Sequence, residues 1–254
     1  MKIGVMQGRL SKPSEGFQEC PNDWKYEFNL LSSLGLNHIE WVITSKNFSK
    51  NPLFSKNLTD YPISSVCADF MVNKSFTDKY YLEKYLTPVC EKVVQNSIDC
   101  ITIPLLEDSD VNDKKQRTKF ISSIYQYLKR YQTVSFFIEA ELHHSILREI
   151  VDTSTNLFVT YDTGNITSCK IDHEEYIYAL KDKIGQVHLK DRNFGSTNTV
   201  IPGTGDTDFR NIFKTLKDID YAGYYTLQTA REKSGNEIDT IKKHKQIMEK
   251  YYYG

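Results

Sequence analysis

Eight short segments rich in apolar and β-branched residues recur along the 254-residue chain, and patterns typical of helices separate them. Each segment is only four to six residues long, which suits strands that are buried on both faces of a parallel sheet. The predicted strands are 3–6, 38–42, 63–67, 100–103, 134–138, 157–161, 184–189 and 224–227. Eight strands that alternate with helices over this length match the (β/α)8 arrangement, so we expect an α/β protein with a single TIM-barrel domain over residues 1–254.

The helical patterns predict helices over residues 24–34, 79–96, 113–131, 145–151, 174–180, 209–219 and 238–252. We expect Asp23 and Asp208 to cap the first and the sixth of these helices, and Gly35 to end the first. Pro88 interrupts the second helix, so a kink or a restart capped by Thr87 is expected there. Residues 44–61 are polar and predict a loop with one short turn over the barrel mouth.

An open doubly wound sheet is the competing architecture. It is disfavoured because residues 6–9 carry no glycine fingerprint for a dinucleotide and no linker-like stretch divides the chain.

The charge balance argues against a polyanionic partner. Lys and Arg number 32 and Asp and Glu number 33, giving a formal net charge of −1, so neither nucleic acid nor an acidic membrane surface is expected to bind. The five cysteines are scattered without metal-site or disulfide spacing, which favours a reducing compartment. The longest apolar run, 176–180, is far too short to span a membrane, and residues 1–9 lack a signal-peptide pattern. We therefore predict a cytoplasmic protein with a small-molecule partner, and a homo-oligomer remains open.

Polar side chains end four successive predicted strands, where the chemistry of a barrel is placed. They are Glu139, Asp162, His188 and Gln228. Two carboxylates, one imidazole and an amide oxygen at one point would suit a single divalent ion such as Mn²⁺, Mg²⁺, Co²⁺ or Zn²⁺. No second cluster is visible in the sequence.

Each of these residues has an ordinary structural explanation when it is taken alone. A carboxylate at a strand end usually caps a helix or forms a salt bridge, and a lone histidine such as His188 is usually a hydrogen-bonded core residue. Their coincidence on consecutive strands favours the metal site. Glu141 has the same strand parity as Glu139 and would be the ligand if the register were shifted by two residues.

Six short motifs occur along the chain: MQGRLS at 6–11, IEW at 39–41, EAEL at 139–142, YDTGN at 161–165, VHLKDR at 187–192 and GTG at 203–205. In these motifs and in their order, over essentially its whole length, the chain resembles the sugar phosphate isomerase/epimerase family with the xylose-isomerase-like barrel.

The resemblance implies that a divalent metal is held by Glu139, Asp162, His188 and the residue at the eighth strand, and that it binds two oxygens of an open-chain sugar. In that family, glutamates on strands five and eight usually both ligate the metal and transfer protons on opposite faces of an enediolate. This chain departs from the pattern, since Gln228 can ligate through its amide oxygen but cannot take a proton. Glu232, four residues later, is the alternative second base.

Several charged residues near strand ends are candidates for substrate binding. Glu40, Asp69 and Glu141 would bind hydroxyls or form structural salt bridges, and a cluster of basic residues would neutralise an anionic substrate or remain solvated. The candidates for substrate binding are Arg9, Glu40, Asp69, Glu141, Asp191, Arg192 and Arg231. The glycine-rich turn at 203–205 suits phosphate at a helix N-terminus, although Asp206 and Asp208 would repel it.

The sequence thus favours a metal-dependent sugar isomerase or epimerase, with Glu139 as the proton-transfer base and Lys190 or Arg192 stabilising negative charge. One alternative is a non-catalytic sugar- or metal-binding barrel in which Gln228 marks a degenerate site. Another is a phosphodiesterase of the endonuclease IV type, which needs a histidine-rich three-zinc cluster. His143 and His144 follow a predicted strand, but only His188 clearly ends one.

Overall fold

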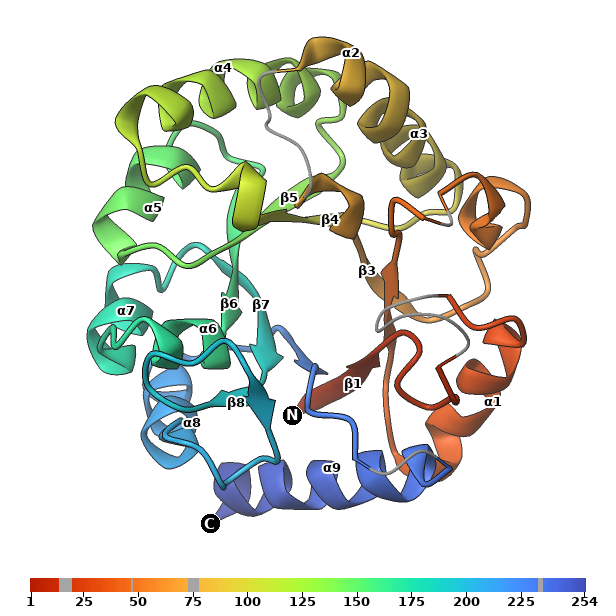
Figure 1. Ribbon diagram of the computed structural model, residues 1–254, viewed down its shortest axis with the longest axis vertical. Coiled ribbons are helices and arrows are strands. Elements are labelled where there is room, and N and C mark those ends of the chain that lie inside the picture. The colour runs from red at the N-terminus through yellow and green to blue at the C-terminus, as the bar shows by residue number, and fades with distance from the viewer. Residues whose placement is uncertain (14–19, 47, 73–77, 233–234) are drawn as a thin grey trace.

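A closed parallel barrel forms the centre of the molecule, as predicted. The computed structural model describes residues 1–13, 20–46, 48–72, 78–232 and 235–254, and within them eight strands close in the order β1-β10-β7-β6-β5-β4-β3-β2 (Figure 1). The barrel strands are β1 Lys2–Met6, β2 Ile39–Val42, β3 Ile63–Cys67, β4 Cys100–Leu105, β5 Ser135–Ala140, β6 Leu157–Asp162, β7 Ile184–Leu189 and β10 Tyr224–Leu227. All eight predicted strands are confirmed, and only some ends shift by one or two residues.

Helices surround the barrel and cover its apolar outer face (Figure 1). They are α1 Trp24–Leu34, α2 Lys79–Tyr81, α3 Thr87–Gln95, α4 Lys114–Arg130, α5 His144–Val151, α6 Thr163–Ser168, α7 His173–Ala179, α8 Phe209–Asp218 and α9 Glu237–Tyr253. Gly35 ends α1 in the left-handed region with φ 61°, and the Asp208 side chain accepts from the Asn211 amide at the start of α8. Asp23 takes the predicted cap position before α1, but its side chain makes no capping hydrogen bond.

The second predicted helix is interrupted near Pro88. A π-helical segment, Leu82–Leu86, separates α2 from α3, and Pro88 lies in the first turn of α3, where its missing N–H disturbs the helical ladder least. The expected restart is confirmed. Thr87 does not cap it, since the Thr87 hydroxyl binds the Glu83 carboxylate at 3.0 Å.

The polar segment 44–61 contains two short 3₁₀ turns, Phe48–Lys50 and Pro52–Phe54, rather than the one turn predicted; residue 47 lies outside the described residues. Buried Asn51 fixes the segment to β2, because its side chain accepts from Trp41 Nε1 at 2.8 Å and donates to the Val42 carbonyl at 3.0 Å. A polar stretch with one well-placed amide can therefore be ordered without a regular helix.

A short helix and a two-stranded ribbon near the ends of β6 and β7 were not predicted. Helix α6 begins directly after β6, and a two-stranded antiparallel ribbon, β8 Asp191–Arg192 and β9 Thr199–Val200, follows β7. Both are shorter than the window in which periodicity is measurable.

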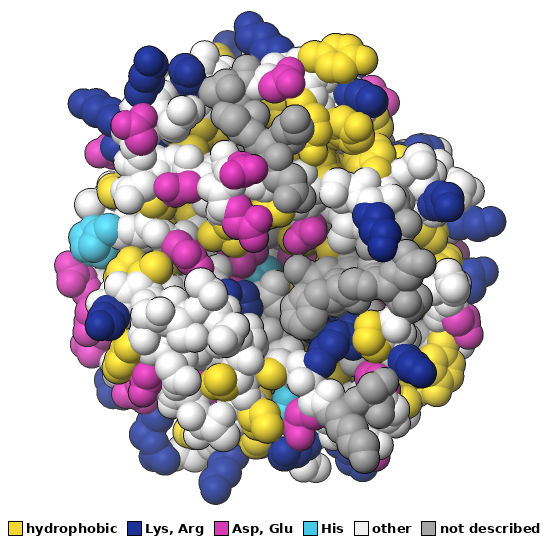
Figure 2. Space-filling model, viewed as in Figure 1, with side chains coloured by type: hydrophobic (Ala, Val, Ile, Leu, Met, Phe, Trp, Pro, Cys, Tyr) yellow, Lys and Arg dark blue, Asp and Glu magenta, His cyan; other side chains and the backbone are white. Residues whose placement is uncertain are grey.

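The space-filling view in the same orientation is hollowed at its centre, and Asp and Glu side chains gather beside the hollow (Figure 2). Among the residues described, no helix is both long and apolar enough to cross a membrane.

Candidate metal centre and substrate cavity

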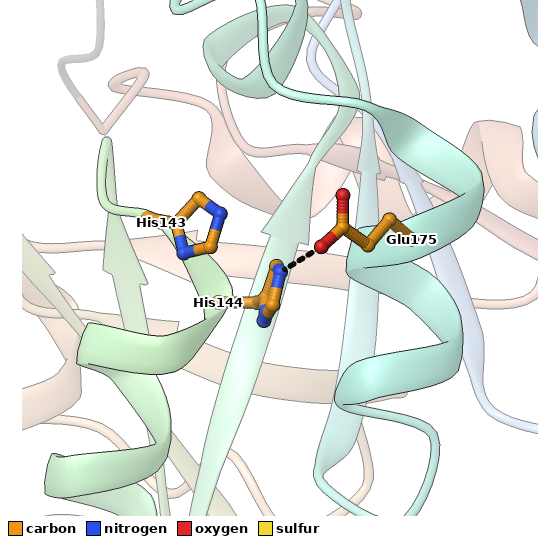
Figure 3. A group of neighbouring side chains, drawn as sticks. All are labelled: His143, His144 and Glu175. Carbon is orange, nitrogen blue, oxygen red and sulfur yellow. Dashed lines mark hydrogen bonds and ion pairs between the residues drawn. The ribbon is translucent and has the colours of Figure 1, made fainter.

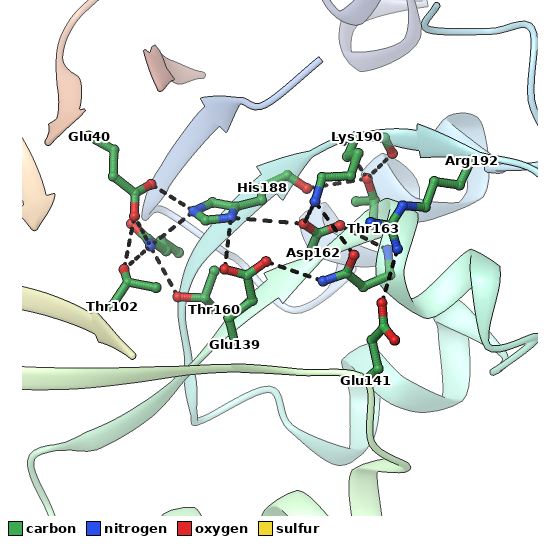
Figure 4. A network of polar contacts seen from close by, with 12 residues as sticks. Glu40, Thr102, Glu139, Glu141, Thr160, Asp162, Thr163, His188, Lys190 and Arg192 are labelled. Carbon is green, nitrogen blue, oxygen red and sulfur yellow. Dashed lines mark hydrogen bonds and ion pairs between the residues drawn. The ribbon is translucent and has the colours of Figure 1, made fainter. Parts of the chain in front are cut away.

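Glu139, Asp162 and His188 meet inside one end of the barrel. Each is buried, and one potential ligand atom from each lies within 4.8 Å of the other two (Figure 4). They come from the neighbouring strands β5, β6 and β7, and the register places Asp162 opposite His188. The structure therefore brings together three of the four predicted ligands.

The two ring nitrogens of His188 have different surroundings. Nε2 lies 2.7 Å from Glu40 Oε2, whereas Nδ1 faces Glu139 Oε2 at 3.7 Å and Asp162 Oδ2 at 4.0 Å. Nδ1 is buried and has no hydrogen-bond partner within the described part of the chain. Burial lowers the pKa of His188, but the carboxylates of Glu40 and Glu139 outweigh it and raise the pKa to about 10.

Asp162 links the end of β6 to α6. Its Oδ1 accepts from the Asn165 amide at 2.9 Å and so caps α6, which leaves Oδ2 facing Lys190 Nζ at 2.7 Å. Burial raises the pKa of Asp162, but Lys190 and His188 outweigh it and hold the pKa below its ordinary value. Gly164 makes room for the lysine, since a Cβ there would lie 2.8 Å from Lys190 Cγ.

Asn165 is a site residue that we did not single out from the sequence. Its side-chain amide donates to Glu139 Oε1 at 3.2 Å, while its backbone amide holds Asp162. Thr163 in the same turn donates to the carbonyls of His188 and Lys190. The signal was present in the YDTGN motif at 161–165, where a capping Asp precedes a short polar turn.

Gln228 follows β10 and lines the same cavity as Glu139. Its backbone N–H donates to the Leu189 carbonyl at 3.1 Å, which fixes it beside β7. Its Oε1 is buried without a hydrogen-bond partner in the ranges described, so an acceptor oxygen is available there.

A cavity of about 560 Å³ opens above these residues. Its lining includes most of the predicted substrate-binding and charge-stabilising residues, namely Arg9, Asp69, Lys190, Arg192 and Arg231. Cys67, Glu107 and residues 197–199 also line it and were not predicted. A separate cavity of about 630 Å³ beside the N-terminal ends of α1 and α9 contains none of the predicted ligands.

Two arginines bring positive charge to the cavity. Burial, together with Arg231, lowers the pKa of Arg9 to about 9. Arg231 donates to the carbonyls of Gly8 and Ser11. Beneath them Glu27 accepts from the amides of Gly8 and Leu10, at 2.8 and 3.0 Å, and holds the loop after β1.

Three of the predicted substrate-binding residues do not line the cavity. Glu40 is fully buried against His188, and exposed Glu141 pairs with Arg192 Nη1 at 3.0 Å. Asp191 accepts from the backbone amides of Gly203 and Gly205, at 2.7 and 3.0 Å. These bonds occupy the amides that the turn at 203–205 would offer to a phosphate. The turn therefore binds the Asp191 carboxylate instead.

Glu232, the alternative second base, is also outside the cavity lining. Its carboxylate pairs with Lys243 at 3.1 Å and with His244 at 2.9 Å, on the α9 side of the barrel.

A second group of potential ligands lies on the outer surface, contrary to the expectation of a single cluster. His143, His144 and Glu175 come together where α5 begins beside α7, and His144 Nε2 lies 2.9 Å from Glu175 Oε1 (Figure 3). His143 Nδ1 accepts from the Ser145 amide and caps α5. These histidines are not part of the interior cluster, which contains one histidine among the described residues.

The interior donor set fits a divalent cation. The carboxylates of Glu40, Glu139 and Asp162 outnumber the ammonium of Lys190 by two, so a neutral His188 would leave two negative charges uncompensated. Buried charges need such compensation. His188 Nδ1 has no hydrogen-bond partner among the described residues, and together with the carboxylate oxygens it is the mixed nitrogen and oxygen set that Zn²⁺, Co²⁺ and Mn²⁺ accept.

Comparisons with known proteins agree with this fold. The profile of the xylose isomerase-like TIM barrel family matches residues 116–251, more than half of the chain. An inosose dehydratase of Clostridium perfringens is 29% identical over 39% of this chain, and the match spans only 40% of that relative's length. The IOLI protein, solved with a bound zinc atom, superposes with a TM-score of 0.76 at 17% identity over 100% of both chains. A D-tagatose 3-epimerase-like protein superposes with a TM-score of 0.75 at 17% identity, over 100% of this chain and 97% of the other. On the closed barrel and the family match together, the chain belongs to the xylose isomerase-like TIM barrel family.

Proposed function

We propose that the protein is an enzyme that isomerises or epimerises a small sugar or sugar phosphate through an enediolate, using one divalent ion held by Glu139, Asp162, His188 and Gln228. The observation that carries the proposal is the convergence of the first three residues beside a cavity of about 560 Å³. The ion would be Mn²⁺, Mg²⁺, Co²⁺ or Zn²⁺, and the zinc-bound structural neighbour is consistent with this class.

Glu139 is the proposed base. Asn165 holds Glu139 Oε1, which leaves Oε2 on the side of His188 and the other ligands. The metal, when bound, would polarise the substrate carbonyl. The Glu139 carboxylate would take the proton from the carbon beside the carbonyl; the C–H electron pair then forms the C=C bond, and the carbonyl π electrons move to oxygen. The neighbouring hydroxyl then gives its proton to the former carbonyl oxygen, and its O–H electron pair forms the new C=O bond. The C=C electrons take the returned proton at the former carbonyl carbon, which completes an aldose–ketose isomerisation.

Lys190 is the proposed stabiliser of the charge that develops on oxygen. Its ammonium lies at the cavity wall, 2.7 Å from buried Asp162 Oδ2, and it has donors to spare. A fixed cation in a buried site stabilises such charge far better than water does. Arg9, Asp69, Arg192 and Arg231 would bind the hydroxyls, or a phosphate, of the substrate.

The glutamine at position 228 favours one-base chemistry. An epimerase that inverts a carbon through an enediolate needs a proton-transfer group on each face, and an amide cannot serve as one. Glu232 and Glu40 do not line the cavity. We therefore expect isomerisation with one base ahead of two-base epimerisation.

Dehydration of a keto-sugar is a second candidate, which the partial match to inosose dehydratase favours. It begins with the same proton removal by Glu139, after which the enediolate electrons expel a hydroxide from the next carbon and Lys190 or another acid protonates it as water. This route also needs only one base.

The test is turnover of a panel of aldoses, ketoses, their phosphates and cyclic keto-sugars by the full chain, loaded separately with each metal. NMR and mass spectrometry in deuterated water separate the routes. An isomer with deuterium on one face, or partial internal proton return, supports one base, and a product lighter by one water supports dehydration. Efficient inversion with solvent label on the inverted carbon would refute the one-base proposal.

Two further outcomes decide the alternatives. Full metal occupancy without turnover of any substrate would favour a non-catalytic binding barrel. Incision of abasic DNA would favour a nuclease, although His143 and His144 do not reach the interior cluster. The cytoplasmic location, the absence of nucleic-acid and membrane partners, and the oligomeric state stay predictions.

A further inference from the structure

Glu40 has a buried position that suits a different task from substrate binding. It lies on β2, has no exposed surface and does not line the cavity. Its Oε2 lies 2.7 Å from His188 Nε2, on the side of the ring opposite to Glu139 and Asp162. The carboxylate therefore contacts the candidate metal centre only through the imidazole (Figure 4).

The surroundings of Glu40 keep it an acceptor. Its Oε1 accepts from the Thr102 hydroxyl at 2.9 Å and from Gln186 Nε2 at 3.1 Å, so two donors face this oxygen. His188 Nε2 has two polar neighbours, Glu40 Oε2 at 2.7 Å and Gln186 Nε2 at 3.2 Å. Because the carboxylate is the nearer neighbour and accepts from donors on its other oxygen, the geometry assigns the hydrogen of this contact to Nε2.

Gln186 is itself held in one orientation. Ser65 Oγ donates to Gln186 Oε1 at 3.1 Å, which turns the NH₂ group toward Glu40 Oε1, toward the hydroxyls of Thr102 and Thr160, and to within 3.2 Å of His188 Nε2. If the amide turned over, its oxygen would face the Glu40 carboxylate. The serine on β3 thus fixes the amide, and the amide supports the carboxylate.

We infer that Glu40 is a positioning residue of the metal centre: it keeps the proton of His188 on Nε2 and so directs the unprotonated Nδ1 to the ion shared with Glu139 and Asp162. This inference rests on the metal site of the proposed function. A carboxylate behind a ligating histidine fixes its tautomer and ring orientation and raises its basicity, and removing such a partner typically lowers metal affinity by about 10- to 100-fold.

The decisive variant is Glu40→Gln, which keeps the shape of the side chain and removes its charge. Titration calorimetry with Co²⁺ should show an affinity about 10- to 100-fold weaker than that of the parent. Ser65→Ala, which removes only the bond that orients Gln186, should weaken Co²⁺ binding by a smaller factor in the same direction. Glu91→Gln removes an exposed carboxylate that pairs with Arg130, and it should bind like the parent.

A spectroscopic readout separates positioning from general destabilisation. In the Zn²⁺-loaded parent, the ¹⁵N shifts of the His188 ring should show the proton on Nε2 and the metal on Nδ1. In Glu40→Gln this pattern of shifts should be weakened or lost, while the urea midpoint of unfolding stays close to that of the parent. If Glu40→Gln does not fold, Ser65→Ala decides, and parent-like affinity in it would overturn the inference.

Binding by Glu40→Gln within about twofold of the parent would overturn the positioning role alone. A parent chain that binds neither Co²⁺ nor Zn²⁺ would overturn both this inference and the proposed metal site.

Discussion

Replacing His173 tests whether a neutral histidine holds the end of β6, next to Asp162. The Tyr161 hydroxyl lies 2.6 Å from His173 Nδ1, and Thr167 Oγ1 lies 2.9 Å from Nε2. Because the Thr167 hydroxyl donates to the Thr163 carbonyl at 2.8 Å, it accepts from Nε2–H, and Nδ1 accepts from Tyr161. Every contact is thus satisfied by the neutral ring, and burial lowers the pKa of His173 from 6.5 to about 4.

The sign and size of the effect follow from these two pKa values. The stability that neutral His173 supplies is complete above the pKa of the unfolded chain, 6.5, and is lost as the pH falls from 6.5 toward 4. Between pH 7 and pH 5 the free energy of unfolding should fall by about 1 to 2 kcal/mol because of this residue. The lower value applies because part of the ring reaches solvent, which screens its charge.

Urea unfolding of the parent and of His173→Gln at pH 7 and pH 5 measures this directly. The destabilisation caused by the substitution should be about 1 to 2 kcal/mol smaller at pH 5, because the variant has no histidine to protonate there. The matched control, Tyr80→Phe, removes an exposed hydroxyl and no histidine, so it should change stability equally at both pH values. If the parent and His173→Gln lose equal stability between pH 7 and pH 5, the assignment of a neutral His173 is wrong.

Three further predictions concern the site. Asp162→Ala and His188→Ala should each abolish binding of one divalent ion per chain, measured by elemental analysis after dialysis. If an ion remains, the surface group at His143 must first be shown not to hold it; an ion still bound in the interior would contradict the site. Glu139→Gln should reduce turnover to background with a thermal midpoint within a few degrees of the parent, since this carboxylate is kept for chemistry rather than packing; an equal loss in Glu141→Gln would contradict the assignment. Metal-loaded protein should neither bind nor incise an abasic duplex near physiological salt in a gel assay, given the net charge of −1.

The sequence predicted well what depends on local pattern. Short apolar runs identified every barrel strand, and the strand ends identified Glu139, Asp162 and His188, because strand periodicity and the placement of chemistry in barrels are both regular. Of the two candidate carboxylates on this strand, Glu139 lies in the interior cluster, whereas Glu141 is exposed and pairs with Arg192.

The partners of those residues were not predictable from one sequence. Gln186 looks like any polar residue within a strand, and its contacts with Ser65, 121 positions away, depend on how the barrel closes. Asp191 lies three residues after His188 in the motif, yet its carboxylate accepts from backbone amides of a later loop. Such pairings are set by tertiary geometry, which no local periodicity encodes.

The contact between Ser65 and Gln186 joins strands that lie opposite each other in the ring, with three strands between them on either side. This contact forms only when the pairing of β1 with β10 closes the barrel, because losing that pairing separates β3 from β7. An ion held by His188 would therefore bind the closed barrel more tightly than an open one. Free metal at about 100 times its dissociation constant would stabilise the closed barrel by about 2.7 kcal/mol. When a chelator removes the metal, hydrogen exchange should therefore speed up more at the amides that pair β1 with β10 than at the amides of the other strands.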